Sequence, residues 1–264
     1  APISEAVIVT IAAVQAAGIP VTIATGRTLD YVRQHIMPLG IATPVVTTQG
    51  AVVGDPLTGQ ILNETVIPLH LARQAVAWID AQPYVTALYF NDDDGHIQIY
   101  QNRAGDDIEF LDHVFGFPRS IQTPFAPLLE VETARSPLKF IVVEDRERYG
   151  VDVLGELKAR FSPDLTITRT HPRLVEGTAQ GIDKGLGVLH LCQLLKIDPQ
   201  RVLAIGDSDN DIPMLEAVGF GVAMGNSTPG VIAAAQYNAP SVEEDGVAVA
   251  LQELVLKHLP KPLS

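Results

Sequence analysis

The sequence has a single cysteine, Cys192, so it lacks a disulfide framework and a zinc site built from cysteines. Cys192 lies in the apolar helical run 186–195, and we expect it to be an ordinary core residue. The 7 histidines are scattered without the spacing of paired metal ligands. A zinc site made of histidines is therefore not expected either.

Long hydrophobic runs are also lacking. No apolar stretch approaches the roughly 18 residues that indicate a membrane-spanning helix. Residues 1–17 have neither the basic flank nor the cleavage pattern of a signal peptide. We therefore expect no membrane partner and a cytoplasmic location.

Positive charge is scarce, because 18 Lys and Arg residues stand against 31 Asp and Glu residues, for a formal net charge of −13. This charge repels nucleic acid, and no cluster of basic residues offsets it. A small anionic ligand is still compatible with the sequence, since one local cation can outweigh the overall field. The length of 264 residues allows one large domain or two modest ones.

The two ends of the chain alternate between helical and strand patterns. The predicted elements are helix 5–17, strand 19–24, helix 28–38, strand 44–48, helix 183–197, strand 201–206, helix 210–218, strand 220–224, helix 228–236 and helix 245–258. Ser4 is the expected N-cap of the first helix. This alternation is typical of an α/β core with a Rossmann-like, doubly wound parallel sheet, to which we assign residues 1–66 and 175–264.

The middle of the chain, residues 67–174, has a different pattern. The predicted elements are helix 69–81, strands 84–90 and 96–101, helix 106–114, strand 137–143, helix 146–160, and strands 164–170 and 173–176. Asp94 and Gly95 predict a hairpin turn, whereas the Pro-rich stretch 117–138 is expected to contain loop. These patterns predict an α+β domain inserted into the core.

Two groups of polar residues directly follow predicted strands, where ligands bind in a doubly wound sheet. The strand IPVTIA is followed by Thr25, Gly26 and Arg27, which offer a hydroxyl, an unhindered backbone N–H and a guanidinium. This group suits a phosphate. The strand RVLAIG is followed by the acidic segment 207–211 (DSDND), whose oxygen atoms suit a hard divalent cation.

A third feature is Lys184, which the segment GIDKG places in the first turn of a helix. The helix dipole disfavours a cation at this end unless an anion shares the site. A phosphate would supply that anion, and the helix N-terminus would help to hold it.

Each of these features also has an ordinary structural interpretation. The Thr-Gly-Arg segment can be a simple turn, Asp209 or Asn210 can cap a helix, and Lys184 can be a solvated surface residue. Their joint placement at strand and helix ends of one sheet favours a shared phosphate and metal site. An EF-hand loop is excluded, because Ile212 stands where that loop needs glycine.

The order of the motifs resembles the haloacid dehalogenase superfamily, and within it the Cof-type sugar-phosphatase branch with a large cap. The resemblance rests on GIPVTIATGR, on GIDKG, on GDSDNDIPML and on the late EEDGVA, and it covers nearly the whole chain. It implies a phosphatase that hydrolyses a small phosphorylated metabolite, such as a sugar phosphate, with residues 67–174 as the cap that selects the leaving group.

The resemblance also implies roles for individual residues. Thr25 binds the transferring phosphoryl group, with Gly26 and Arg27 beside it. Lys184 neutralises the phosphoryl oxygens and the nucleophile, and Asn210 lies near the phosphate. These five positions are the expected catalytic and phosphate-binding residues.

The implied cofactor is Mg²⁺. In the family pattern the two acidic positions that match Asp207 and Asp211 serve this ion, directly or through water. They are the expected metal-binding residues of this sequence.

One motif of the family is not found in this chain. The motif DxDGT, at the end of a hydrophobic strand, supplies the nucleophile of an aspartyl-phosphate mechanism and the general acid, and it should precede Ile3. The similar string 92–96 (DDDGH) falls inside the predicted insertion, so we expect a hairpin turn without a catalytic role. We therefore expect the chain alone to be inactive, and the absent strand to leave two internal sheet edges without partners.

Two other functions fit the same residues. A phosphate-ligand binding module would bind phosphate esters without turnover, which isothermal titration would reveal. A phosphomutase on the same scaffold would transfer the phosphoryl group to a sugar hydroxyl instead of water.

Overall fold

The structure is a computed structural model that describes residues 3–92, 94–116, 118–130 and 135–259. The chain divides into two compact units. The first unit consists of Ala1–Thr58 and Asp183–Ser264, and the second consists of Gly59–Ile182. The two ends of the chain thus belong to one unit.

The first unit is an α/β structure. Its helices are α1 (Glu5–Ala16), α2 (Leu29–His35), α8 (Lys184–Leu195), α9 (Ile212–Ala217), α10 (Pro229–Ala234) and α11 (Gly246–Leu254). Its 3-10 helices are η1 (Met37–Leu39), η2 (Thr48–Gly50), η3 (Pro199–Arg201), η4 (Asp209–Asp211), η5 (Val242–Glu244) and η6 (Leu256–His258). Its strands are β1 (Val45–Thr47), β2 (Val52–Gly54), β10 (Leu203–Gly206), β11 (Phe220–Ala223) and β12 (Tyr237–Asn238). Strands β10, β11 and β12 are parallel, whereas β1 and β2 are antiparallel.

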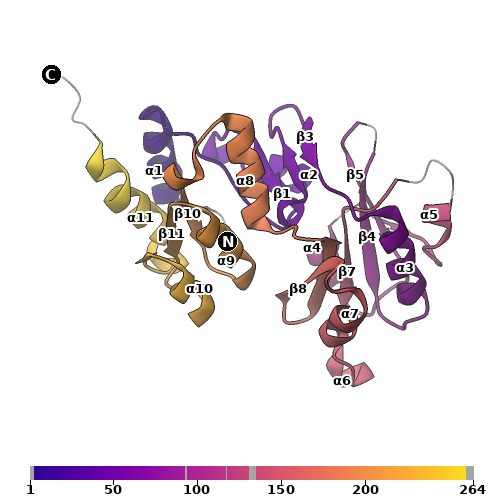
Figure 1. Cartoon of the computed structure of the whole chain (residues 1–264). Coiled ribbons are helices and arrows are strands. Elements are labelled where there is room, and N and C mark those ends of the chain that lie inside the picture. The colour runs from indigo at the N-terminus through magenta and orange to yellow at the C-terminus, as the bar shows by residue number, and fades with distance from the viewer. Residues whose placement is uncertain (1–2, 93, 117, 131–134, 260–264) are drawn as a thin grey trace. The chain divides into compact units, whose positions relative to one another are not determined.

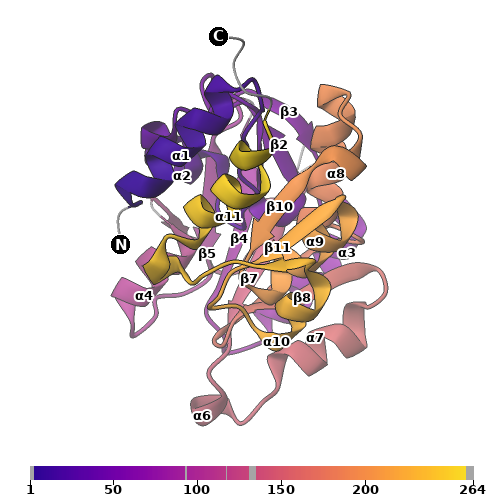
Figure 2. The ribbon, with the colours of Figure 1, turned by 90° about the vertical axis from the view of Figure 1, so that its left-hand side faces the viewer.

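Four helices of this unit, α1, α2, α8 and α10, begin where the sequence provides a capping side chain. The Ser4 hydroxyl accepts a hydrogen bond from the Val7 N–H at 3.3 Å, and the Asp183 carboxylate accepts one from the Leu186 N–H at 2.8 Å. The predicted N-cap of the first helix is therefore confirmed, and Lys184 lies in the first turn of α8 as predicted. Figure 2 shows α1 lying against α11.

The prediction of a strand at 19–24 is wrong, because this segment does not form a regular strand. Only Ala24 forms a parallel bridge, to Val46 of β1. Pro20 has no N–H to donate, and both Pro20 and Thr22 are exposed. A strand buried on both faces needs a neighbour on each edge, and among the described residues this segment has a strand partner only on the β1 side.

Helix α8 covers an apolar core to which both small sheets contribute. Val46 of β1, Ala204 of β10, and Val188 and Leu191 of α8 belong to one buried cluster. Cys192 belongs to the same cluster with 5% of its surface exposed, and burial raises the pKa of its thiol. The prediction that Cys192 is a core residue is confirmed.

The backbones of η2 and α8 approach each other closely. A Cβ atom on Gly50, whose φ is +96°, would lie 2.0 Å from the Asp183 carbonyl oxygen. A Cβ atom on Gly187 would lie 2.7 Å from the Gly50 Cα. Glycine is therefore required at both positions, and the contact brings the start of α8 next to the turn that follows β1.

We expect Gly50→Ala to lower the free energy of unfolding by about 2–3 kcal/mol, because the methyl group overlaps the Asp183 carbonyl and the backbone is left-handed. The matched control is Gly18→Ala. Gly18 has a similar φ of +79° but nothing within 4 Å of the added carbon, so we expect a loss of only about 1 kcal/mol. Urea denaturation followed by circular dichroism measures both changes, and equal losses would contradict the close approach.

The second unit is an α+β structure, as predicted. Its helices are α3 (Leu69–Asp80), α4 (Ile108–Phe115), α5 (Pro127–Glu130), α6 (Arg146–Tyr149) and α7 (Val153–Phe161). Its strands are β3 (Ile61–Glu64), β4 (Thr86–Asn91), β5 (Ile97–Gln101), β6 (Ser120–Ile121), β7 (Lys139–Val143), β8 (Leu165–His171) and β9 (Leu174–Ala179). Six strands form one sheet in the order β6-β5-β4-β7-β9-β8.

Alternating residues of this sheet face two apolar clusters. Leu88 and Phe140 pack with α3, α5 and α7 on one face. Tyr89 and Ile141, the neighbours of these residues along the strands, pack with α4 on the other face. Figure 1 shows the sheet between these helices. No helix of the described residues is long and apolar enough to cross a membrane.

The second unit is longer at both ends than the predicted insertion 67–174. At its end, β9 pairs with β7 and β8 and so belongs to the large sheet. At its start, Glu64 of β3 accepts a hydrogen bond from the Asn91 side-chain amide at 3.3 Å. Residues 175–182 therefore lie in the second unit. Residues 59–66 cluster with this unit too, although β3 is a strand of the three-stranded sheet β1-β2-β3, which agrees with the assignment of these residues to the core.

Candidate active site

Thr25, Gly26 and Arg27 form a tight turn where the extended segment beside β1 ends. The Thr25 N–H donates to the Val46 carbonyl at 2.9 Å, and the Arg27 N–H donates to the Thr25 hydroxyl at 3.1 Å. The guanidinium carbon of Arg27 lies 4.9 Å from the centre of the Tyr31 ring on α2. The three predicted phosphate-binding residues therefore lie on one hydrogen-bonded turn of the first unit.

Gln49 of η2, which the sequence analysis did not single out, contacts this turn. Its backbone N–H donates to the Thr25 carbonyl at 3.1 Å, and its side-chain Oε1 accepts a hydrogen bond from Asn210 Nδ2 at 3.0 Å. A Cβ atom on Gly26 would lie 2.4 Å from Gln49 Nε2. Gln49 therefore connects the Thr25 turn to the acidic segment. The signal that could have found it is its place just after strand β1, the rule that identified Thr25.

Lys184 forms a buried ion pair with Asp211. The distance from Lys184 Nζ to Asp211 Oδ1 is 2.6 Å, and the two side chains are 10% and 6% exposed. The anion that a lysine requires at a helix N-terminus is therefore supplied by the protein itself. Because Asp211 directly follows Asn210, this pair lies beside the contact with Gln49.

Asp211 also closes the turn that follows β10. Its Oδ2 accepts hydrogen bonds of 3.0 Å from the backbone N–H groups of Asp207 and Ser208. A Cβ atom on Gly206 would lie 2.5 Å from the Asp211 Cβ, so glycine is needed where this side chain folds back. Both carboxylate oxygens of Asp211 are thus engaged by donors.

Asp207 is an exposed carboxylate of the same turn. Its Oδ1 accepts a hydrogen bond from the Ser208 hydroxyl at 3.2 Å, and its Oδ2 accepts one from Asn226 Nδ2 at 3.2 Å. Asn226 was not predicted, although it lies just beyond the carboxyl end of β11. Asp209 is directed elsewhere, since its carboxylate accepts a hydrogen bond from the Thr228 hydroxyl. Asp207 and Asp209 are thus both exposed, but only the Asp207 carboxylate lies directly after β10, beside Asn226.

These contacts fit a Mg²⁺ ion held by few protein ligands. Among the described residues, no group of three or more His, Cys, Asp or Glu side chains could enclose a metal ion. Mg²⁺ is commonly held by one or two carboxylates, with water and substrate phosphate as its other ligands. Asp207 can supply one such carboxylate, whereas Asp211 already pairs with Lys184.

The acidic string in the second unit forms a hairpin turn, as predicted. The carboxylate of Asp92 accepts hydrogen bonds from the backbone N–H groups of Asp94 and His96 at 3.0 and 2.8 Å. Burial raises the pKa of the Asp92 carboxyl, but these N–H donors outweigh it and leave the pKa below its usual value. Asp93 lies outside the described residues.

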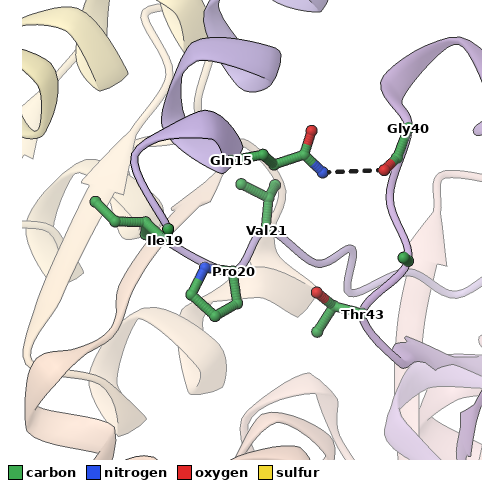
Figure 3. Close-up of a pocket in the computed structure, with 8 residues that line it drawn as sticks. Gln15, Ile19, Pro20, Val21, Gly40 and Thr43 are labelled. Atoms are coloured by element: carbon green, nitrogen blue, oxygen red, sulfur yellow. Dashed lines mark hydrogen bonds between the residues drawn. The ribbon is translucent and has the colours of Figure 1, made fainter.

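The first unit also has a hollow of about 450 Å³ that is separate from these residues. Figure 3 shows its lining, with the Gln15 side-chain amide donating a hydrogen bond to the Gly40 carbonyl at 3.2 Å. Ile19, Pro20 and Val21 border it, at the amino end of the segment that leads to the Thr25 turn. The hollow shares no residue with the candidate site.

A family model described as haloacid dehalogenase-like hydrolase matches residues 1–251 of the chain. Phosphoglycolate phosphatase of Methanopyrus kandleri is 30% identical, over 91% of this chain and 84% of that protein. Phosphatase YwpJ of Bacillus subtilis is 27% identical, over 90% of this chain and 88% of that protein. The similarity thus extends over both units.

Solved structures show the same fold. A haloacid dehalogenase-like hydrolase from B. subtilis superposes with a TM-score of 0.81 and 25% identity, over 96% of this chain and 94% of that chain. The sugar phosphatase BT4131 of HAD subclass IIB superposes with a TM-score of 0.73 and 22% identity, over 96% of this chain and 92% of that chain. The architecture of both units is therefore shared with known hydrolases.

Proposed function

The chain belongs to the haloacid dehalogenase-like hydrolases and is a phosphoric monoester hydrolase of the Cof-type branch, and from this premise we propose that it hydrolyses small phosphate esters such as sugar phosphates with Mg²⁺. The observation that carries the proposal is the set of contacts that joins Thr25, through Gln49, to Asn210, beside the Lys184–Asp211 pair. A hydroxyl, a lysine and an exposed carboxylate thus lie on neighbouring turns.

In the proposed reaction, the Thr25 turn binds the phosphoryl oxygens. The Thr25 hydroxyl and the Gly26 backbone orient them, and Arg27 and Lys184 supply positive charge nearby. Lys184 stabilises the charge that shifts onto these oxygens in the transition state. Asn210, held by Gln49, would lie near the bound phosphate.

Asp207 is the proposed direct ligand of Mg²⁺, and Asn226 and Ser208 orient its carboxylate. Bound there, Mg²⁺ would offset the repulsion between an attacking carboxylate and the phosphate. Asp211 would contribute by holding Lys184 and the turn in place, and it would serve the metal through water, because both of its carboxylate oxygens already accept from protein donors.

The proposed nucleophile is an aspartate on a strand between β10 and the segment 19–24. Two observations support such a strand. Leu203 and Ile205 of β10 and Ile23 of the segment stay only half-buried, although buried parallel strands are normally covered on both faces. The two small sheets also contribute to the same core under α8. This aspartate would attack the phosphorus and form an aspartyl-phosphate as the bond to the leaving alcohol breaks, and the alcohol would depart with a proton from a general acid. Water would then hydrolyse the aspartyl-phosphate to inorganic phosphate and the free carboxylate.

We further propose that the second unit, residues 59–182, is the cap that selects the leaving group and excludes water during the reaction. The support is its compact fold and its position in the chain, between the Thr25 turn and Lys184. The names of two similar proteins mention small substrates, phosphoglycolate in one and a sugar phosphate in the other.

A phosphate-release assay tests this function. A panel of sugar phosphates and phosphoglycolate is incubated with Mg²⁺ or with a chelator, using the present chain and a longer one that includes the residues encoded upstream. We expect near-background release from the present chain, and Mg²⁺-dependent release from the longer one. Equal release from both would place the nucleophile within residues 1–264. No release from either, with phosphate esters still bound in titration calorimetry, would favour a binding module.

A further inference from the structure

Residues 48–50 form a buried turn with a costly backbone. Thr48 and Gln49 have φ values of 53° and 60°, and Gly50 follows with 96°. Only glycine adopts this left-handed region readily, so two of the three residues are held there against their preference. Both non-glycine residues are buried, with Gln49 at 9% exposure. Strain of this kind persists only where surrounding contacts enforce it, and it is concentrated at ligand sites.

The enforcing contacts come from the Thr25 turn. The Thr48 N–H donates to the Arg27 carbonyl at 2.8 Å, and the Gln49 N–H donates to the Thr25 carbonyl at 3.1 Å. These two bonds fix the Gln49 backbone opposite Gly26, which has no side chain in the way. The strained conformation therefore directs the Gln49 side chain across the phosphate-binding turn.

The two ends of the Gln49 carboxamide have different environments. Oε1 accepts the hydrogen bond from Asn210, so Nε2 is the end that carries the N–H donors. Among the described residues, no hydrogen bond joins Nε2 to an acceptor of the protein. Nε2 therefore carries the N–H donors that the contact with Asn210 does not use, and it lies against Gly26.

We propose that Gln49 binds substrate, donating an N–H of Nε2 to a phosphoryl oxygen held by the Thr25 turn. This inference rests on the proposed function and adds a binding residue to it. Asn210 fixes the orientation of the amide, so that the donor end faces the phosphate. The bond forms to the bound phosphate in the ground state as well as in the transition state, and its loss raises KM more than it lowers kcat.

The test is Gln49→Glu, which keeps the side-chain length and an oxygen that can accept from Asn210 but replaces the donor with a negative oxygen. Binding of inorganic phosphate with Mg²⁺ is measured by titration calorimetry. We expect the dissociation constant to rise at least about 10-fold, as for the loss of a hydrogen bond to a charged group. Gln49→Met, which removes the donor without adding charge, should give a rise in the same direction. The control Gln193→Glu, an exposed change on α8, should stay within about twofold.

Circular dichroism establishes that each variant is folded. If Gln49→Glu and Gln49→Met both bind phosphate like Gln193→Glu, Gln49 is only a structural link and the inference is wrong. The inference also fails if the parent protein binds no phosphate. A parent protein that binds phosphate but hydrolyses no ester overturns the proposed function instead, and the Gln49 comparison then still decides this inference.

Discussion

Replacing Lys184 with methionine is expected to lower the free energy of unfolding by about 3 kcal/mol. The change removes one partner of a buried ion pair and leaves the Asp211 carboxylate without its counter-charge, which commonly destabilises by about 3–5 kcal/mol. The lower end of that range applies because Asp211 Oδ2 keeps its two backbone N–H donors. Methionine has a similar helix propensity to lysine, so α8 itself loses little.

Guanidinium denaturation followed by circular dichroism measures this change, with Lys257→Met as the matched control. Lys257 also pairs with a carboxylate, that of Glu253, but the two side chains are 61% and 44% exposed. Solvent screens such a pair, and its loss should lower the free energy of unfolding by less than about 1 kcal/mol. Equal losses in the two variants would show that the Lys184–Asp211 pair is not buried as described.

The substitution Asp207→Asn is expected to reduce Mg²⁺-dependent turnover at least about 100-fold in a form of the protein that hydrolyses phosphate esters. Asparagine keeps the size of the side chain but loses the charge that a hard cation requires. The contribution of a catalytic metal is several kcal/mol, which corresponds to a factor of this order or more. Initial rates measured against Mg²⁺ concentration also show whether the half-saturating concentration increases.

The matched control is Asp209→Asn, in the same turn. Its carboxylate accepts from the Thr228 hydroxyl, and an asparagine oxygen can accept the same bond. We expect turnover within about twofold of the parent protein. Full turnover by Asp207→Asn at unchanged Mg²⁺ dependence would remove Asp207 from the metal site.

The parts of the site that could be predicted from sequence are those that follow strong local patterns. Thr25 and Asp207 follow apolar runs, so their placement needed only the rule that ligands bind at the carboxyl ends of strands. Lys184 follows the helix cap Asp183, which places it in the first turn of α8. Gln49 and Asn226 occupy equivalent places after β1 and β11. They were missed because an amide in a polar turn has no distinctive composition, and its role depends on contacts between distant segments.

In the fold, too, the elements with strong local patterns could be predicted, and those that depend on distant contacts could not. Helices with a capping residue, such as α1 and α8, lie where the sequence predicted them. The prediction of a strand at 19–24 is wrong because apolar composition indicates burial and β propensity only. A strand also requires neighbours with which to exchange hydrogen bonds. The predicted boundary at residue 174 differs from the structure for a similar reason, since the pairing of β9 is decided by sheet partners outside its own sequence.

The Lys184–Asp211 pair has a consequence for the end of the catalytic cycle. In the proposed reaction, the charge of Lys184 is already partly neutralised by the Asp211 carboxylate 2.6 Å away. Inorganic phosphate would therefore never meet an uncompensated cation. Departure of that product then exposes no uncompensated charge to a low-dielectric interior. Because Lys184 keeps Asp211 as its partner while the product leaves, we expect little inhibition by accumulated phosphate.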